Sequence, residues 1–211
     1  RSFNSRVVQA LGEVVDAVSA ASCLNVAKVV RGGSVGKGTS ISGVADAEVV
    51  LFLSGLPPVG HDRWLPPLVR AVAGTLSDRL SGDRLLESIE ATEDSVRLRV
   101  KGLLCVDLRF SAAYESYGKA IEAMGAQRPE ARKFYTPALI EERVQFIVRQ
   151  PSSVKVTIRL LKWWRSQQEW SSKLAYPADD ILELMAVYSA VQTKPAHQCA
   201  AVANVMALLS R

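Results

Sequence analysis

"RGGSVGKGTSISGVADAEVVLFL", residues Arg31–Leu53, joins a glycine-rich turn to a wholly apolar run of strand length. Its glycines and lysine call for comparison with the phosphate-binding loop G-x-x-x-x-G-K-[ST]. That motif fails twice, because Arg31 stands where the first glycine is required and Gly38 stands where the loop needs Ser or Thr. A strand–GxGxxG–helix dinucleotide fingerprint is missing as well. The stretch is therefore not a standard ATP loop.

Two acidic residues at the mouth of the apolar run indicate a different nucleotide chemistry. Asp46 and Glu48 are spaced i, i+2, and residues with that spacing on a strand share one face. Two carboxylates on one face can bind two Mg²⁺ ions, which clamp a triphosphate and activate a hydroxyl for in-line attack. The turn at Gly32, Gly33 and Ser34 lets backbone N–H groups approach the phosphates. This arrangement is similar to the h-G-[GS] … h-[DE]-h-[DE]-h pattern of the nucleotidyltransferase superfamily related to DNA polymerase β.

A third carboxylate is expected from a neighbouring strand, and Asp107 in "LLCVDLRF" is the candidate. A carboxylate inside an apolar strand is costly without a partner, so a metal ion would explain it. For each acid taken alone, the alternative is a strand-edge or salt-bridged carboxylate. The turn, the paired acids and Asp107 together favour a metal site.

Periodicity predicts an α+β N-terminal half followed by a helical half, which we divide into residues 1–136 and 137–211. Apolar residues at helical spacing predict helices over about 5–22 and 62–81. Five strands are expected at "NVAKVV", "AEVVLFL", "RLLESIE", "SVRLRVK" and "LLCVDLRF", and from about residue 137 the pattern is helical.

Composition narrows the class of protein. The 211 residues are 48% hydrophobic and 22% charged, as in an ordinary globular protein, and no apolar run is long enough to span a bilayer. Three widely spaced cysteines argue against a disulfide framework and fit a reducing compartment, and no zinc-ligand spacing exists. The net charge of +5 is compatible with nucleotide or nucleic-acid partners. No leader is visible at the start, and we expect the chain to be a fragment of a longer protein.

The segment "KVVRGGSVGKGTSISGVADAEVVLFL" resembles the corresponding segment of the 2′-5′-oligoadenylate synthetases, and the likeness continues in "VDLRFSAAY", "SVKVTIRLLKWW" and "ILELMAVY". The resemblance implies a polymerase β-like mixed sheet with flanking helices, followed by a helical domain that ends before the family's remaining helices. It also implies transfer of adenylate from ATP to a 2′-hydroxyl, with release of pyrophosphate, in innate antiviral-type signalling. A cytoplasmic location, with the nucleus as a further one, and no membrane partner are implied as well.

The resemblance assigns roles to the residues of the opening stretch and to Asp107. Asp46, Glu48 and Asp107 would be the catalytic triad that binds two Mg²⁺ ions, and Asp107 would help to activate the attacking hydroxyl. Gly33 and Ser34 would hold the triphosphate of ATP.

Four basic residues receive roles from the resemblance. Lys162 falls where the family places a lysine that contacts ATP phosphate, and Arg159 shares its helix face at i, i+3 spacing. Arg31 and Lys37 match basic positions that grip the family's activator, double-stranded RNA. The alternative for Arg159 and Lys162 is a solvated basic face. For Lys37 the alternative is a solvated lysine, since a glycine-rich turn gives it little reason to be buried.

The chain departs from the family at three places. Glu48 stands where the synthetases have Asp, and Asp179 and Asp180 stand where they typically have Gln and Tyr that contact the nucleotide. Val144 and Val148 stand where basic RNA contacts are expected. For Asp179 the alternative is that it caps the helix that follows.

Three functions remain open from the sequence. The first is a metal-dependent, template-independent nucleotidyltransferase of the 2′-5′-oligoadenylate synthetase type. The second is a catalytically impaired, RNA-binding relative of the same fold. The third is a related synthase with another product, such as a cyclic dinucleotide.

Overall fold

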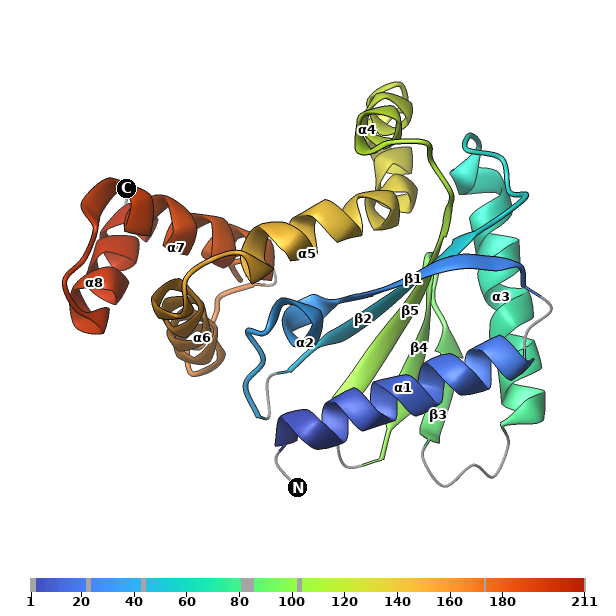
Figure 1. Cartoon of the computed structure of the whole chain (residues 1–211), viewed down its shortest axis with the longest axis horizontal. Helices are drawn as coiled ribbons and strands as arrows, with labels where there is room; N and C mark the ends of the chain where they lie inside the picture. The colour runs from blue at the N-terminus through green and yellow to red at the C-terminus, as the bar shows by residue number, and fades with distance from the viewer. Residues whose placement is uncertain are drawn as a thin grey trace. The chain divides into compact units, whose positions relative to one another are not determined.

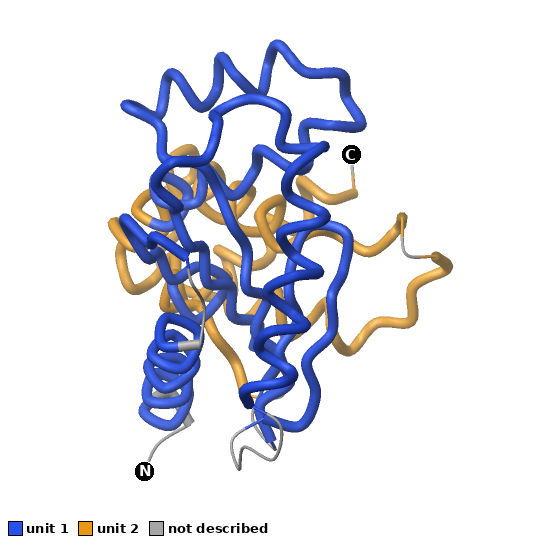
Figure 2. The backbone as a smooth tube through the Cα atoms, turned by 90° about the vertical axis from the view of Figure 1, so that its right-hand side faces the viewer, with its two compact units in different colours: residues 1–36, 45–144 blue, residues 37–44, 145–211 orange. Residues whose placement is uncertain are grey.

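The chain forms two compact units in a computed structural model (Figure 2). Unit 1 consists of residues 1–36 and 45–144, and unit 2 of residues 37–44 and 145–211. The domain boundary expected after residue 136 stays a prediction. The structure describes residues 3–21, 24–42, 45–80, 86–101, 104–172 and 174–210, so Cys23 lies outside the described residues.

Unit 1 is built on a mixed five-stranded sheet with the order β1-β2-β5-β4-β3 (Figure 1). Strands β2 and β5 are parallel, and the other neighbours are antiparallel. The predicted strands are confirmed, and their bounds are β1 Val26–Gly32, β2 Ala47–Leu53, β3 Leu86–Ala91, β4 Ser95–Val100 and β5 Leu104–Ala112.

The main core lies on one face of the sheet, under α1 (Phe3–Ala21) and α3 (His61–Arg79). Leu11 of α1 and Leu65 of α3 pack with Val49 and the other strand residues that point to this face. The two helices correspond to those predicted over 5–22 and 62–81, with their ends shifted by one or two residues, as is usual for helix boundaries.

The opposite face of the sheet carries a smaller apolar cluster, in which Val50 and Phe52 of β2 pack against Ile140 and Val144. Glu48 belongs to the same alternation as Val50 and Phe52, so its side chain lies on this face. The sheet therefore separates the main core from the face that carries the acids.

Helical structure begins earlier than the sequence predicted. The start at about residue 137 is wrong, because α4 (Tyr117–Gly125) and the 3₁₀ helix η1 (Pro129–Leu139) precede α5 (Ile140–Val148). Ser116 caps α4 by accepting a hydrogen bond from the N–H of Lys119, at 3.3 Å.

Unit 2 is helical and has its own core, in which Ile158, Leu161, Leu182 and Val205 are fully buried. The mixed sheet of unit 1 with its flanking helices, together with the helices of unit 2, confirms the predicted α+β fold class. Among the described residues, no helix combines the length and the apolar character needed to cross a bilayer. The helices of this unit are α6 Ser152–Ser166, α7 Asp179–Thr193 and α8 Gln198–Leu209.

Candidate active site

The glycine turn follows β1 directly and leads into the short helix α2 (Gly33–Lys37). Gly33 has φ +65°, a conformation that side chains disfavour. A Cβ atom on Gly33 would lie 2.8 Å from both the carbonyl oxygen and Oδ2 of Asp46, and one on Gly32 would lie 3.0 Å from Oε2 of Glu48. The absence of side chains at the turn therefore lets two carboxylates lie against its backbone.

Ser34 ties this turn to the start of β2. Its N–H donates to Oδ1 of Asp46 at 3.0 Å, and its hydroxyl donates to the carbonyl oxygen of Asp46 at 3.0 Å and accepts from the Asp46 N–H at 3.1 Å. The side chain is buried. Ser34 thus fixes the position of Asp46, while its predicted contact with triphosphate, like that of Gly33, stays a prediction.

Glu48 and Asp107 lie side by side on neighbouring parallel strands. Their Cα atoms are register partners in the β2–β5 pair, so their side chains point to the same face. Asp46 immediately precedes β2, whose first residue is Ala47. The fold therefore brings all three predicted acids to the same end of β2 and β5.

Two arginines that the sequence did not single out contact these acids. Arg97 Nε donates to Oδ1 of Asp107 at 3.0 Å, and Arg109 lies 3.4 Å from Glu48 and 3.0 Å from Asp94. The hydrogen bond to Asp107 and the negative charge of that carboxylate raise the pKa of Arg97. The alternation of apolar and basic residues in β4 was the signal in the sequence that could have pointed to Arg97. Strand register then places Arg97 opposite Asp107.

The acids fit Mg²⁺ in kind, since this ion prefers carboxylate oxygens. Within the described ranges, however, no three potential ligands are gathered into a metal-binding group. The side chains of Arg97 and Asp107 are 48% and 36% exposed. An ion pair this exposed contributes only about 0–1 kcal/mol, so its opening would release Asp107 at small cost.

In unit 2, Lys162 is only 3% exposed, so the alternative of a solvated basic face is wrong for this residue. Its ammonium group contacts Asp179 at 2.6 Å, Glu183 at 2.8 Å and the hydroxyl of Thr39 at 3.4 Å. Arg159 is half-buried and donates to the carbonyl oxygen of Gly38 at 3.0 Å. The ATP contacts of Arg159 and Lys162 stay predictions.

Lys37 is buried as well, with 5% of its surface exposed, so the expectation of a solvated lysine is wrong. Its ammonium lies 2.7 Å from Glu183 and 2.9 Å from Asp180. Two carboxylates from α7 compensate the buried charge of Lys37. The sequence of the turn alone could not reveal these partners. Arg31, by contrast, is exposed on β1. The RNA-binding roles of Arg31 and Lys37 stay predictions.

Asp179 is the first residue of α7, and the expected helix cap is wrong because Ala178 holds the cap position without a side-chain hydrogen bond. Its carboxylate instead pairs with Lys162 and Arg165. Burial acts to raise the pKa of Asp179, but these two cations hold it below its ordinary value.

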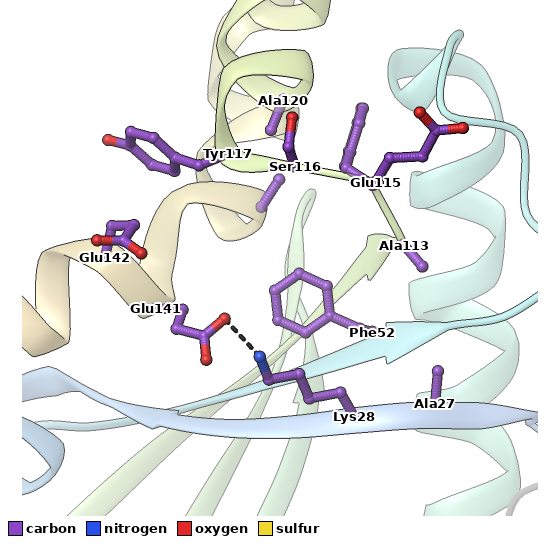
Figure 3. A pocket seen from close by; sticks show the side chains of 12 residues that line it. Ala27, Lys28, Phe52, Ala113, Glu115, Ser116, Tyr117, Ala120, Glu141 and Glu142 are labelled. Atoms are coloured by element: carbon purple, nitrogen blue, oxygen red, sulfur yellow. Dashed lines mark hydrogen bonds and ion pairs between the residues drawn. The ribbon is translucent and has the colours of Figure 1, made fainter.

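A cavity of about 390 Å³ lies elsewhere in unit 1 (Figure 3). Phe52, Tyr117 and Glu142 are among its lining residues, and Lys28 on its wall forms an ion pair with Glu141. None of the predicted catalytic acids lines this cavity. It is therefore separate from the candidate active site.

Comparisons with known proteins agree with the resemblance in the sequence. The family model of 2'-5'-oligoadenylate synthetase 1, domain 2, C-terminus, matches residues 111–211. Rattus norvegicus 2'-5'-oligoadenylate synthase 2 is 25% identical over 199 residues, covering 79% of this chain and 26% of the rat protein. Mus musculus 2'-5'-oligoadenylate synthase 3 is 27% identical over 191 residues, covering 80% of this chain and 16% of the mouse protein. The chain thus spans only part of these relatives.

Solved structures show the same fold at low sequence identity. The CdnE c-di-GMP synthase from Capnocytophaga granulosa matches with a TM-score of 0.66 and 14% identity, covering 99% of this chain and 66% of that one. The Vibrio cholerae DncV cyclic AMP-GMP synthase matches with a TM-score of 0.54 and 14% identity, covering 86% of this chain and 51% of that one. The chain therefore shares the fold of these two synthases.

Proposed function

We propose that the protein to which this chain belongs, which is similar in sequence to the 2′-5′-oligoadenylate synthases, transfers adenylate from ATP to a 2′-hydroxyl. The product would be a 2′-5′-linked oligoadenylate, made without a template and with release of pyrophosphate. Double-stranded RNA would activate the reaction.

The proposal rests on the position of Asp46 and Glu48 against the glycine turn and of Asp107 beside Glu48 on the neighbouring strand. Asp46 lies against Gly33, and Glu48 pairs in register with Asp107. Asp46 would be oriented by Ser34, which holds both its backbone and its carboxylate. Asp107 would accept the proton of the attacking hydroxyl.

Asp46, Glu48 and Asp107 would together hold Mg²⁺. The ions, when bound, would neutralise triphosphate charge and favour ionisation of the hydroxyl. Arg97 would have to release Asp107 for this, and the exposure of both side chains makes that release inexpensive.

The test is product formation by the complete protein with ATP and Mg²⁺, with and without duplex RNA, followed by chromatography that separates 2′-5′ from 3′-5′ linkages. Asp46→Asn keeps an acceptor for the Ser34 N–H but removes the charge, so we expect it to abolish product. Asp16→Asn, at an exposed position on α1, makes the same change and should leave activity intact. No 2′-5′ product from the unaltered protein under any condition would refute the proposal.

A second candidate is an RNA-binding relative without catalysis. The observation in its favour is that arginine side chains contact both Glu48 and Asp107. Duplex binding at low salt without metal-dependent ATP binding would support this candidate, and absence of duplex binding at low salt would exclude it.

A synthase with another product is distinguished by the same chromatography. The similar solved structures include a c-di-GMP synthase and a cyclic AMP-GMP synthase. Offering all four nucleotides, together and singly, would reveal a cyclic or non-adenylate product, which would replace the 2′-5′ assignment while keeping nucleotidyl transfer.

A further inference from the structure

We propose that a cavity in unit 2, at the N-terminal ends of α6 and α8, binds the phosphate group of a small organic molecule. The cavity has a volume of about 590 Å³, which suits a small ligand, and residues of α6, α7 and α8 contribute to its lining. Lys37, Lys162 and the predicted catalytic acids are not among the lining residues. The inference is therefore independent of the proposed function.

A glutamine holds the two helix N-termini together. Gln198, the first residue of α8, donates from Nε2 to the carbonyl oxygen of Ser153 at 3.1 Å. Its Oε1 accepts from the hydroxyl of Thr157 at 2.9 Å. Ser153 and Thr157 lie in the first two turns of α6. The positive ends of two helix dipoles are thus adjacent, and an anion placed there interacts favourably with both.

Both helix ends present donors at the cavity wall. Pro151 stands at the cap position of α6 and offers no side-chain acceptor to the N–H groups of the first turn. His197 caps α8, and its Nδ1 accepts from the N–H of Ala200 at 3.2 Å. Because Nδ1 accepts, Nε2 of the neutral ring carries the proton and can donate to a ligand. Pro151 and His197 both line the cavity.

Ser189 of α7 adds a hydroxyl group that has no partner within the protein. The residue lines the cavity and is only 3% exposed, and its Oγ makes no hydrogen bond. A buried hydroxyl is costly when it is unpaired, and a ligand oxygen would supply the acceptor. Thr157, another buried hydroxyl of the lining, is paired with Gln198. Ser189 is therefore the side chain that points most directly to a ligand.

The charge of the lining favours an anion. Lys194 lines the cavity and is exposed, and no carboxylate among the described residues pairs with its ammonium group. None of the described lining residues is acidic. Lys194 also holds the C-cap position of α7 with φ 42°, a left-handed conformation that glycine adopts without strain. A lysine at this position keeps a positive charge beside the cavity at the cost of that strain.

The number of donors favours phosphate over carboxylate. Two helix ends, His197, Ser189 and Lys194 offer more donors than the two oxygens of one carboxylate group can readily satisfy, whereas a phosphate group has three terminal oxygens. The rest of the wall is largely apolar, and its small side chains leave room for the organic part of the ligand. These residues include Ala186, Ala190, Pro195 and Ala201.

The experiment follows the imidazole resonances of the full chain by NMR during titration with phenyl phosphate. The solution contains EDTA and is held at about pH 8, where the phosphate is a dianion. The chain has two histidines, and His61 is fully buried outside the cavity, so it serves as an internal reference. We expect a saturable shift of the His197 resonances, no shift of His61, and no comparable effect of sodium chloride at the same ionic strength.

Two variants test the donors. Lys194→Gln should weaken binding about 10-fold, as for loss of a charge-assisted contact. Lys101→Gln, at an exposed position of unit 1, makes the same change of net charge and should bind like the unaltered protein. Ser189→Ala should weaken binding about 3-fold to 10-fold without loss of stability, because it removes a buried hydroxyl that is unpaired in the free protein.

Absence of a saturable His197 shift would overturn the proposal, and so would affinities of Lys194→Gln and Ser189→Ala equal to that of Lys101→Gln. Displacement of phenyl phosphate by duplex RNA would assign the cavity to a nucleic-acid backbone and would overturn it as well. Lys194→Asn, whose side chain tolerates the left-handed backbone, serves as a second replacement if the glutamine variant does not fold. Because the readout is binding, the presence or absence of a nucleotide product leaves the result unchanged.

Discussion

Gly33 determines how closely the glycine turn approaches Asp46. Its backbone is in the left-handed region, and any Cβ there would press on both the carbonyl oxygen and the carboxylate of Asp46. Conformation and space thus select glycine independently at this position. Gly55 has a similar φ of +80°, but a Cβ there would meet nothing within 4 Å.

Gly33→Ala should therefore be more destabilising than Gly55→Ala. Both variants carry the backbone strain, about 1–2 kcal/mol, but only Gly33→Ala must also shift Asp46, at a further cost of about 1–3 kcal/mol. Urea unfolding of both variants measures the difference, and both residues belong to unit 1. Equal losses of stability would mean that Asp46 moves aside freely.

The positions of some site residues could be predicted from the sequence, and those of others could not. Asp46, Glu48 and Asp107 could be placed together because strand spacing fixes the face to which each side chain points. Lys37 could not be placed, because its partner Glu183 is 146 residues away along the chain. A buried lysine and an exposed one have the same local sequence pattern when their partner comes from a distant helix.

Helix α7 contributes the carboxylates that neutralise buried cations of unit 2. Glu183 accepts from Lys37 through one oxygen and from Lys162 through the other. Loss of one member of a buried pair usually costs more than the pair contributes, since the remaining charge loses its partner.

Glu183→Gln should destabilise unit 2 by about 3–5 kcal/mol, because each of the two buried ammonium groups loses one of its two carboxylate partners. Urea unfolding followed by the fluorescence of Trp164 and Trp170, which lie in this unit, reports the change. Glu169→Gln provides the exposed control and should fall within about 0.5 kcal/mol of the unaltered protein. A stability for Glu183→Gln equal to that control would show that the lysines find other partners or lose their charge.

Elements were predictable where their periodicity was long and unbroken. The strands and the helices α1 and α3 show clear alternation or helical spacing, and these were found. Helix α4 was missed because it is short and has Gly118 near its start, and η1 because Pro129 and Pro137 read as chain breaks. Both contain residues that weaken the sequence signal without preventing helical turns.

At the scale of the whole molecule, burial of His61 links folding to pH. The residue is fully buried at the start of α3, where its ring packs 4.1 Å from that of Tyr135 and 4.6 Å from that of Trp64, measured between centroids. Neither ring nitrogen of His61 has a hydrogen-bond partner. Burial therefore lowers the pKa of His61 from 6.5 to about 4.

Stability should fall as the pH is lowered from about 6.5 to about 4, because the unfolded chain then binds a proton that the folded chain excludes. Above this window the histidine is neutral in both states, so its contribution is fully present there. His61→Phe keeps an aromatic ring and should remove this component, which amounts to about 3 kcal/mol across the window. Urea unfolding at several pH values, with the variant subtracted from the unaltered protein, isolates it from the carboxylates. Parallel pH profiles would contradict the prediction.

The assignment of residues 37–44 to unit 2 has a consequence for dissecting the gene. A helical fragment cut at residue 145 would lack Lys37 and Thr39, so Glu183 and Lys162 would each lose a contact that the intact chain supplies. Exchange of helical modules between relatives would meet the same difficulty, since the lysine and the helix that neutralises it come from separate stretches of the coding sequence. A transplanted module would therefore need its matching residues 37–44 to travel with it.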